Sequence, residues 1–446
     1  MSARELLARA LAGRRVAWVA PDVGRTLGLA RLLPDPVVLC HDAMGAAVDM
    51  PVHEVQADPA GDDFQGSLSI LNDPSAQRFI RHHRVTDLVL FKVNARIISL
   101  ARDLGLRVLA GDPAVAQRFE HKLHFARMLQ ALSLPAPPTL LFDGPMPSWS
   151  EAARELGEAI VVQGARGHSG QSTHLARSEV DYEHARARLS GRGARLTTLV
   201  EGVTLTINGC AAEGSAPVGR PYIQLTGIPG ATPHALGACG NAFEGDRLGA
   251  PALRAAAERI GVALSSAGYR GIFGVDAVLD AHGAIHVIEV NPRMISGSSL
   301  EALLQSSAGV PPAAAHVLAV LGAELPPSLA GPPVTGGQIV IYSPHDAPCR
   351  VVAAPPAGRY RLDGASLHRV DGQVDPTGCA QDEVVLLARS PGRAVPPTGE
   401  IARVQTTRSL LDERATADAL VERLIAATTA AVRLGGPGQA AGRRLR

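Results

Sequence analysis

Residues 271–293, with the sequence GIFGVDAVLDAHGAIHVIEVNPR, constrain the fold most strongly, because two runs of apolar and β-branched residues flank a short turn signal. We expect a β-hairpin whose two-residue turn is centred on His282 and Gly283. With that turn, Asp276 lies directly opposite Glu289, and directly opposed side chains share one face of a sheet. A three-residue loop would shift the register by one position and separate the two carboxylates.

Two carboxylates on one face need a neutralising partner, because like charges directly opposite one another destabilise a sheet. The same register puts Asn291 opposite Gly274, where the absent side chain leaves room. A divalent cation with oxygen ligands suits this set, and Mg²⁺ would in turn hold the phosphates of ATP. An ordinary exposed hairpin with one polar face is the alternative, and both interpretations stay open on geometry alone.

A glycine-rich segment lies at residues 159–173, AIVVQGARGHSGQST, where an apolar strand runs into three glycines interleaved with hydroxyl side chains. Such a loop can turn backbone N–H groups toward an anion. Neither the Walker A pattern nor the G-x-G-x-x-G fingerprint matches it, because Gln171 stands where Walker A needs lysine and the glycines are spaced three and three. Taken alone, the segment fits a phosphate-binding loop and the tip of a surface hairpin equally well.

The first ~115 residues alternate short apolar runs with helix-like segments, which is typical of a doubly wound α/β domain with a mostly parallel sheet. Strands are expected at 15–20, 36–40, 87–91 and 107–111, with helices at 74–83 and 94–104. Beyond them, the pattern predicts helices at 113–134, 150–156, 178–192, 250–267 and 416–433. A glycine- and proline-rich stretch at 214–249 receives no helix or strand, and residues 324–337 have the composition of a linker before a strand-rich C-terminal piece.

Composition narrows the class of protein. Of the 446 residues 46% are apolar, 19% charged and 3% aromatic, with a net charge of +1, so a large core is available and no nucleic-acid surface is indicated. The five cysteines form no C-x-x-C pair and no apolar run approaches the ~18 residues of a membrane helix, so we expect a cytoplasmic protein without a nucleic-acid or membrane partner. Only Lys92 and Lys122 among the 43 basic residues are lysine, which singles out these two side chains.

The hairpin resembles the metal-binding hairpin of the ATP-grasp superfamily, in which an acidic residue on one strand and a Glu-x-Asn-x-Arg run on the next hold magnesium and ATP. The matching residues are Asp276, Glu289, Asn291 and Arg293, and the resemblance covers roughly residues 115–304 in the expected order. It implies an α/β protein: an N-terminal doubly wound domain, a two-lobed ATP-grasp core of α+β type, and a small mixed C-terminal domain. The corresponding boundaries are 1–112, 113–200, 201–325 and 335–446.

The resemblance also implies roles for individual residues. Lys122 would contact the nucleotide phosphates, although a solvated helix lysine is the alternative. Asp276, Glu289 and Asn291 would bind one or two Mg²⁺ ions, with Mn²⁺ as a substitute. Arg293 would hold the substrate carboxylate or the acyl phosphate. The glycine-rich segment falls where the family has a lid over the triphosphate, which implies nucleotide contacts for Gly167, Ser169, Gly170, Ser172 and Thr173.

The remaining candidate residues lie near the lid and the hinge. The strand before the lid usually ends in a second lysine in this family, whereas this chain has Gln163, which can hydrogen-bond but carries no charge. Arg166 in the lid is the candidate replacement charge, with plain solvation as the alternative. Glu201 resembles the hinge acid that contacts the ribose or adenine, with the backbone near Val203 pairing with the base, and a solvated turn carboxylate is its alternative.

The implied activity is that of an ATP-dependent carboxylate–amine ligase, which forms an acyl phosphate and releases ADP and phosphate. Its substrates would be a small-molecule or peptide carboxylate and amine, and a homodimer is compatible with this interpretation. More weakly, the chain resembles natural-product peptide ligases of the pheganomycin type, through its Val-Val-Gln strand end, its SG-x-ST lid and its extra C-terminal domain. Two rivals stay open: a carboxylase-type enzyme that phosphorylates bicarbonate, and a nucleotide-binding regulatory protein without catalysis.

Overall fold

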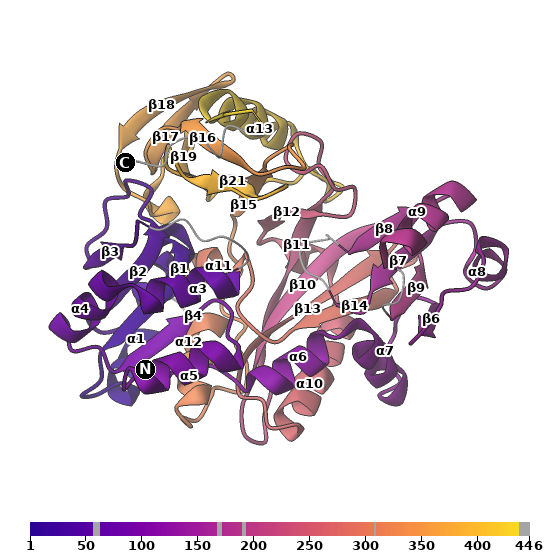
Figure 1. Ribbon diagram of the computed structural model, residues 1–446, viewed down its shortest axis with the longest axis horizontal. Helices are drawn as coiled ribbons and strands as arrows, with labels where there is room; N and C mark the ends of the chain where they lie inside the picture. Colours follow the sequence, from indigo (N-terminus) through magenta and orange to yellow (C-terminus); the bar gives the residue numbers. More distant parts are fainter. Residues whose placement is uncertain (57–62, 167–171, 190–192, 307–308, 437–446) are drawn as a thin grey trace.

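The N-terminal domain is built on a five-stranded sheet in the order β3-β2-β1-β4-β5, in which every pairing is parallel (Figure 1). The computed structural model describes residues 1–56, 63–166, 172–189, 193–306 and 309–436. The strands are β1 (Val16–Asp22), β2 (Val37–Asp42), β3 (Val52–Glu54), β4 (Asp87–Leu90) and β5 (Arg107–Val108). Strands β2 and β4 are buried along their whole length, which explains their uninterrupted apolar runs.

Helices pack around this sheet, and several of them begin at side-chain caps. They are α1 (Ala3–Ala10), α2 (Leu27–Ala30), α3 (Asp63–Asn72), α4 (Pro74–His82) and α5 (Ala95–Asp103), with a short 3-10 turn η1 (Val23–Arg25). Asp73 and Asn94 accept backbone N–H bonds at the starts of α4 and α5, and Pro74 occupies the first turn of α4, where its missing N–H costs nothing. The predicted doubly wound α/β domain is confirmed.

A single helix over residues 113–134 is wrong. The chain forms α6 (Pro113–Glu120) and α7 (Lys122–Ala131), which are separated by an extended residue, His121, with φ −71° and ψ 113°. The break has a tertiary cause, because the backbone N–H of Lys122 donates to the carbonyl of Ala165, 2.9 Å away. That bond ties the start of α7, and with it the Lys122 side chain, to the end of a strand in the next sheet.

The first lobe of the central region is a four-stranded antiparallel sheet in the order β6-β9-β7-β8. Its strands are β6 (Thr139–Phe142), β7 (Ile160–Gly164), β8 (Thr173–Ala176) and β9 (Ala194–Thr198). Helices α8 (Trp149–Leu156) and α9 (Glu179–Leu189) pack on it through a small apolar core that includes Ile160, Val162 and Tyr182.

The second lobe and the C-terminal piece share one ten-stranded sheet in the order β14-β13-β10-β11-β12-β15-β21-β19-β17-β18. The lobe supplies β10 (Gly202–Ala211), β11 (Val218–Thr226), β12 (Ala238–Ala242), β13 (Gly271–Asp280) and β14 (Ile285–Asn291). The C-terminal piece supplies β15 (Gly337–Tyr342), β17 (Gly358–Asp363), β18 (Ser366–Asp371), β19 (Glu383–Ala388) and β21 (Glu400–Thr406). Strand β12 pairs with β15, so the sheet continues from one side of the predicted linker to the other. The stretch 214–249, to which no element was assigned, contains β11 and β12 of this sheet.

The remaining elements pack around these sheets. They are α10 (Pro251–Ser266), α11 (Ser298–Leu304), α12 (Pro312–Val320), α13 (Ala419–Ala431), η2 (Gly245–Leu248), η3 (Pro376–Gly378) and the small sheet of β20 (Ala394–Val395), β16 (Cys349–Ala353) and β22 (Arg433–Leu434). Helix α11 packs against α2, so the N-terminal domain contacts the helix that follows the hairpin. Figure 1 shows α11 beside the strands of that domain.

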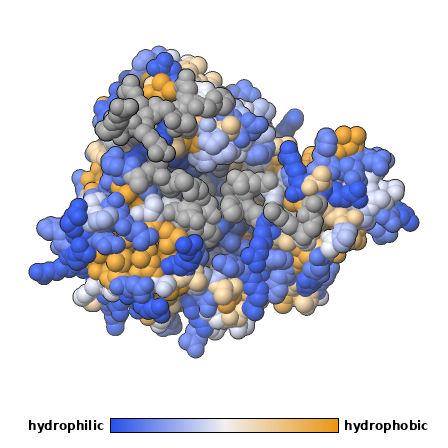
Figure 2. All heavy atoms as spheres, in the orientation of Figure 1, coloured by the Kyte–Doolittle hydropathy of each residue, from blue (hydrophilic) through white to orange (hydrophobic). Residues whose placement is uncertain are grey.

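The face drawn in Figure 2 is largely hydrophilic, with small apolar areas, one of them over the N-terminal domain. Among the described helices none is both long and apolar enough to cross a bilayer.

Candidate active site

The hairpin of β13 and β14 brings the two predicted carboxylates together. Asp276 pairs with Glu289, and Gly274 pairs with Asn291, as the sequence predicts. The predicted two-residue turn is nevertheless wrong, because the backbone N–H of Asp280 donates to the carbonyl of Ala284, 3.0 Å away, which leaves three residues in the loop.

Two local features explain how a three-residue loop still gives this register. Gly283 adopts φ +79°, the left-handed conformation that such a loop requires, and the Asp280 carboxylate accepts the N–H groups of His282 and Ala284, each at 2.9 Å. A β-bulge at Ile288 then inserts one residue between the pairs Ala277–Val287 and Asp276–Glu289. The bulge cancels the one-residue shift of the loop, so the carboxylates face each other.

Asp276 is buried, and hydrogen bonds from two side chains hold the pair in place. The Thr206 hydroxyl on the neighbouring strand β10 donates to Asp276 at 2.6 Å. The Asn291 amide donates to Asp276 at 3.1 Å and to Glu289 at 3.0 Å. Burial raises the pKa of Asp276, and the bond from Thr206 and the charge of Lys122 oppose that rise.

This donor set fits a magnesium ion that completes its coordination with phosphate and water. The two carboxylates offer oxygen atoms as ligands. Asn291 offers its amide oxygen once its amide group turns, because the amide nitrogen now faces the carboxylates. In the parts of the chain that the structure describes, no group of three or more His, Cys, Asp or Glu side chains could hold a metal ion by itself. Asp276, Glu289 and Asn291 would therefore hold such an ion together with the ligand.

Two cations flank the carboxylates. Lys122, at the first position of α7, forms an ion pair with Glu289, and burial lowers the pKa of Lys122 to about 7, with nearby Arg195 adding to the shift. Arg293 donates through Nε to the Glu120 carboxylate at 2.8 Å and through Nη2 to the Asn291 amide oxygen at 2.8 Å. The structure thus joins Lys122, Asp276, Glu289, Asn291 and Arg293 in one network of hydrogen bonds and ion pairs.

Gln163 stands where the resemblance implies a lysine. It is buried beside an arginine that the sequence did not single out. Arg195 stands directly opposite it on β9 and donates to the Gln163 amide oxygen through Nε, at 2.9 Å, and through Nη2. Nη1 of Arg195 donates to the Ile288 carbonyl in the bulge at 2.9 Å. Burial lowers the pKa of Arg195 to about 10, so the guanidinium stays charged at neutral pH.

The predicted lid is described only at its two ends. Gly167, Ser169 and Gly170 lie outside the described residues. Arg166 is exposed, two residues beyond the end of β7, and its charge contributes to a lowered pKa of His121, which burial chiefly causes. After the undescribed residues, the backbone carbonyl of Ser172 accepts the backbone N–H of Gly164 at 3.0 Å. The Thr173 hydroxyl accepts from the Gln163 amide at 3.2 Å.

The predicted hinge residues lie apart from this network. Glu201 is 80% exposed in the connection between β9 and β10 and forms an ion pair with Arg177 at 3.5 Å. Val203 follows at the start of β10, where it pairs with Leu279 of β13. Among the described contacts, neither residue bonds to the carboxylates of Asp276 and Glu289, and their expected contacts to adenine or ribose stay predictions.

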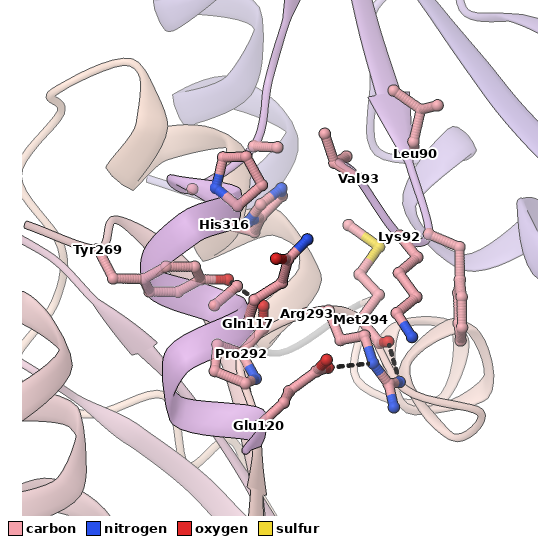
Figure 3. Close-up of a pocket in the computed structure, with 15 residues that line it drawn as sticks. Leu90, Lys92, Val93, Gln117, Glu120, Tyr269, Pro292, Arg293, Met294 and His316 are labelled. Carbon is pink, nitrogen blue, oxygen red and sulfur yellow. Dashed lines mark hydrogen bonds and ion pairs between the residues drawn. The ribbon is translucent and has the colours of Figure 1, made fainter. Parts of the chain in front are cut away.

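A pocket opens beside Arg293, between the ends of β4 and β5, helix α6 and the residues after β14 (Figure 3). Its open volume is about 460 Å³, counting the part that is continuous with solvent. Lys92, which follows β4, lines it together with Glu120 and Arg293, and Figure 3 shows the Lys92 side chain extending toward the Arg293 side of the pocket. The position agrees with a general rule for open α/β sheets, in which ligands bind at the carboxyl ends of the strands.

The pocket carries a net positive charge. Lys92 and Arg293 are cations and Glu120 is an anion, whereas burial lowers the pKa of His316 to about 4 and keeps that imidazole neutral. Leu90, Val93 and Met294 supply apolar walls. An anion with an apolar side chain is the ligand that complements this lining.

Three residues of this site had no role assigned from the sequence. Lys92 stood out as one of two lysines in the chain, but no motif linked it to the site. Thr206 and Arg195 had no signal, because their roles arise from pairings between strands far apart in the chain.

The family model described as an ATP-grasp domain matches residues 119–297. None of the curated proteins compared with the chain matches it in sequence.

Several crystal structures share the fold at low sequence identity. The biotin carboxylase domain of the 2-oxoglutarate carboxylase from Hydrogenobacter thermophilus, bound to MgADP, ADP and bicarbonate, has a TM-score of 0.60 and 14% identity, over 89% of this chain and 86% of that one. Biotin carboxylase from Campylobacter jejuni has a TM-score of 0.58 and 12% identity, over 95% and 92%. An N5-carboxyaminoimidazole synthase from Aspergillus clavatus, bound to ADP and 5-aminoimidazole ribonucleotide, has a TM-score of 0.56 and 13% identity, over 92% and 98%. These likenesses extend beyond the matched domain into the N- and C-terminal parts of the chain.

Proposed function

This chain contains an ATP-grasp domain at residues 119–297, and on that basis we propose that it is an ADP-forming ligase that uses ATP and Mg²⁺ to join a carboxylate to an amine. The observation that carries the proposal is the opposed pair Asp276 and Glu289, held by Asn291 on one face of the hairpin and flanked by Lys122 and Arg293. A buried carboxylate, Asp276, directly opposite the partly exposed carboxylate of Glu289, with two adjacent cations, forms a site for a metal ion and a polyphosphate, not a stabilising motif for a sheet.

The chain contributes positioning and charge neutralisation, which are what phosphoryl transfer chiefly requires. Asp276, Glu289 and Asn291 would hold Mg²⁺, which when bound neutralises the phosphate oxygens. Lys122 would leave Glu289 to contact the nucleotide phosphates. Arg293, which Glu120 and Asn291 hold on two sides, would face the reacting carboxylate and stabilise the negative charge there.

The reaction needs only ATP, the acid and the amine as reactants. A carboxylate oxygen of the acid attacks the γ-phosphorus, the bond from that phosphorus to the β-phosphate oxygen breaks, and ADP leaves. The amine nitrogen then attacks the carbonyl carbon of the acyl phosphate, the bond to the phosphate oxygen breaks, and phosphate leaves as the nitrogen loses a proton. The product is an amide or, with an amino acid and a peptide as substrates, a peptide bond.

The pocket beside Arg293 supports a small acid as the substrate that becomes phosphorylated. Lys92 and Arg293 suit its carboxylate, and the apolar walls near Leu90 and Val93 suit a hydrocarbon side chain, as in an apolar amino acid. The second candidate is a carboxylase-type enzyme, which the shared fold with biotin carboxylases favours. Apolar walls argue for the first candidate, since bicarbonate has no apolar part to bury there.

A panel assay tests the proposal. ADP release from Mg-ATP would be measured with amino acids, short peptides and bicarbonate, and the products identified by mass spectrometry. We expect release that needs both a carboxylate and an amine, a strong loss in Glu289→Ala, and no loss in the exposed control Glu213→Ala. The ligase proposal is wrong if no carboxylate with an amine raises release above background and Glu289→Ala leaves nucleotide affinity unchanged. Release that bicarbonate alone supports would select the carboxylase, and nucleotide binding without any turnover would select a regulatory protein.

A cytoplasmic location is part of the same proposal. All five cysteines are free, four of them buried, which suits a reducing compartment.

A further inference from the structure

Gln163 lies in the middle of a polar row that crosses three strands of the first lobe. Arg195 on β9 and Thr173 on β8 are its direct neighbours on either side. The Gln163 oxygen accepts from Arg195 Nε at 2.9 Å and from Nη2, while its amide nitrogen donates to the Thr173 hydroxyl at 3.2 Å. Gln163 and Arg195 are only 6% and 3% exposed. The glutamine is therefore a neutral acceptor whose partner is a buried cation.

The arginine explains why a lysine is absent at this position. A lysine at 163 would put an ammonium directly opposite the Arg195 guanidinium in a buried pair, where like charges repel and neither could be well solvated. Glutamine instead supplies the oxygen that the guanidinium needs. In this chain the positive charge is on β9, one strand away from the position on β7 where the resemblance implies a lysine.

Arg195 lies where a charge can act on a nucleotide. Nη1 donates to the carbonyl of Ile288 at 2.9 Å, directly before the metal-site residue Glu289. Its charge also contributes to the lowered pKa of Lys122, the other cation of the site. The guanidinium thus lies between the strand that leads into the lid and the hairpin that carries the carboxylates. It also has more N–H donors than its contacts with Gln163 and Ile288 use.

We propose that Arg195 supplies the second positive charge that binds the nucleotide diphosphate, and that Gln163 positions its guanidinium. The inference rests on the ATP site proposed above and assigns one of its residues. It also predicts a chemical equivalence: lysine on β7 with a neutral residue on β9 should serve the same purpose as glutamine on β7 with arginine on β9.

Equilibrium binding of ATP, ADP and adenosine, each with Mg²⁺, tests the proposal without knowledge of the acid or amine. The variants are Arg195→Gln, Arg195→Lys, the exchange Gln163→Lys with Arg195→Gln, and Arg127→Gln as the control, because Arg127 is an exposed arginine that pairs with Asp143 on the surface. Circular dichroism and thermal unfolding show whether each variant folds.

We expect Arg195→Gln to raise the Kd of ATP and ADP by about 10- to 100-fold, the loss typical of hydrogen bonds to a charged group, with the Kd of adenosine changed less than about twofold. Arg195→Lys should lose part of the affinity, since it keeps the charge without the fork. The exchange variant should return to within about fivefold of the wild-type affinity for ATP. Arg127→Gln should leave all three values unchanged.

Either of two results with Arg195→Gln would overturn the inference while the ligase proposal stands. In the first, wild-type protein binds ATP and Arg195→Gln leaves that affinity unchanged. In the second, ATP and adenosine weaken by the same factor, which would make Arg195 a structural link between the lobes through Ile288. A misfolded Arg195→Gln leaves Arg195→Lys and the exchange variant to decide, and an exchange variant that folds but binds ATP no better than it binds adenosine also overturns the inference. Wild-type protein that binds no ATP would refute both proposals.

Discussion

Glu301, on α11 beneath the metal hairpin, should make the stability of the protein fall as the pH rises. The residue is 1% exposed, and one carboxylate oxygen accepts from the Asn208 amide at 2.5 Å. Asn208 is two residues from Thr206 on β10, so it lies on the same face of the strand as the residue that holds Asp276. Burial raises the pKa of Glu301 from 4.5 to about 8, and the bond from Asn208 opposes only part of the rise.

The sign and size of the effect follow from proton linkage. Above pH 4.5 the unfolded chain has released the Glu301 proton, whereas the folded protein keeps it up to about pH 8, so the free energy of unfolding falls over this interval. Between pH 5 and pH 8 the contribution is about 3.5 kcal/mol, at about 1.4 kcal/mol for each pH unit fully inside the interval. With about 2.1 cal/mol/K of unfolding entropy per residue, this corresponds to about 4 °C in Tm if the whole chain unfolds together, and more for a smaller cooperative unit.

Glu301→Gln removes the titrating group and keeps the shape of the side chain. Tm of the variant and of wild type would be measured at several pH values from 5 to 8, with Glu213→Gln, an exposed carboxylate, as the control. We expect the Tm of Glu301→Gln relative to wild type to rise by about 4 °C or more from pH 5 to pH 8, and the control to run parallel to wild type. Parallel curves for Glu301→Gln and wild type would show that Glu301 is ionised in the folded protein or titrates near its ordinary pKa, and the reasoning would be refuted.

Three further changes test other contacts. Thr206→Val removes the hydroxyl that orients Asp276 and should raise the Mg²⁺ concentration for half-maximal ADP release by about 10-fold, as expected for a residue that supports a metal ligand; an unchanged Mg²⁺ dependence would contradict this role. Lys92→Gln should raise KM for the carboxylate substrate by about 10-fold and leave KM for ATP unchanged, whereas Lys92→Arg should retain most of the affinity, and equal effects on both KM values would move Lys92 out of the substrate pocket. In Gly28→Ala, the new methyl group would lie 2.0 Å from the Ser299 carbonyl oxygen, so we expect a loss of about 1–3 kcal/mol in unfolding free energy; Gly144→Ala, which meets nothing within 4 Å, is the control in the same thermal unfolding experiment.

Local patterns in the sequence were sufficient for much of the fold. The apolar runs of β2 and β4 and the caps at Asp73 and Asn94 act within a few residues, and the N-terminal domain could be predicted from them. The break at His121 could not, because it depends on a bond from Lys122 to Ala165, more than forty residues away along the chain. Strands β11 and β12 were hidden for a related reason. Their glycines and prolines resemble those of a loop, and only the neighbouring strands supply the partners that make them part of the sheet.

Some residues of the candidate site could likewise be predicted from local sequence, and others could not. Asp276, Glu289, Asn291 and Arg293 lie within one hairpin, so a local pattern can identify them together. Arg195 meets Gln163 only through the pairing of β9 with β7, and it meets the hairpin only through the contact between two lobes. Gln163 alone therefore suggests a missing charge, and the charge becomes visible only once the strand beside it is known.

The bulge at Ile288 links the carboxylate pair of the hairpin to Arg195. A two-residue turn without a bulge would place Asp276 opposite Glu289 equally well, so the pairing of the carboxylates does not by itself require the longer loop. A bulged residue, however, has a backbone group that the sheet ladder does not use, and the carbonyl of Ile288 accepts from Arg195. The three-residue loop and the bulge together preserve the metal pair and also present an acceptor to the guanidinium one residue before Glu289. Shortening the loop while removing the bulge should therefore keep Mg²⁺ binding and release Arg195, so that affinity for ATP falls as it does in Arg195→Gln while the Mg²⁺ dependence stays that of wild type.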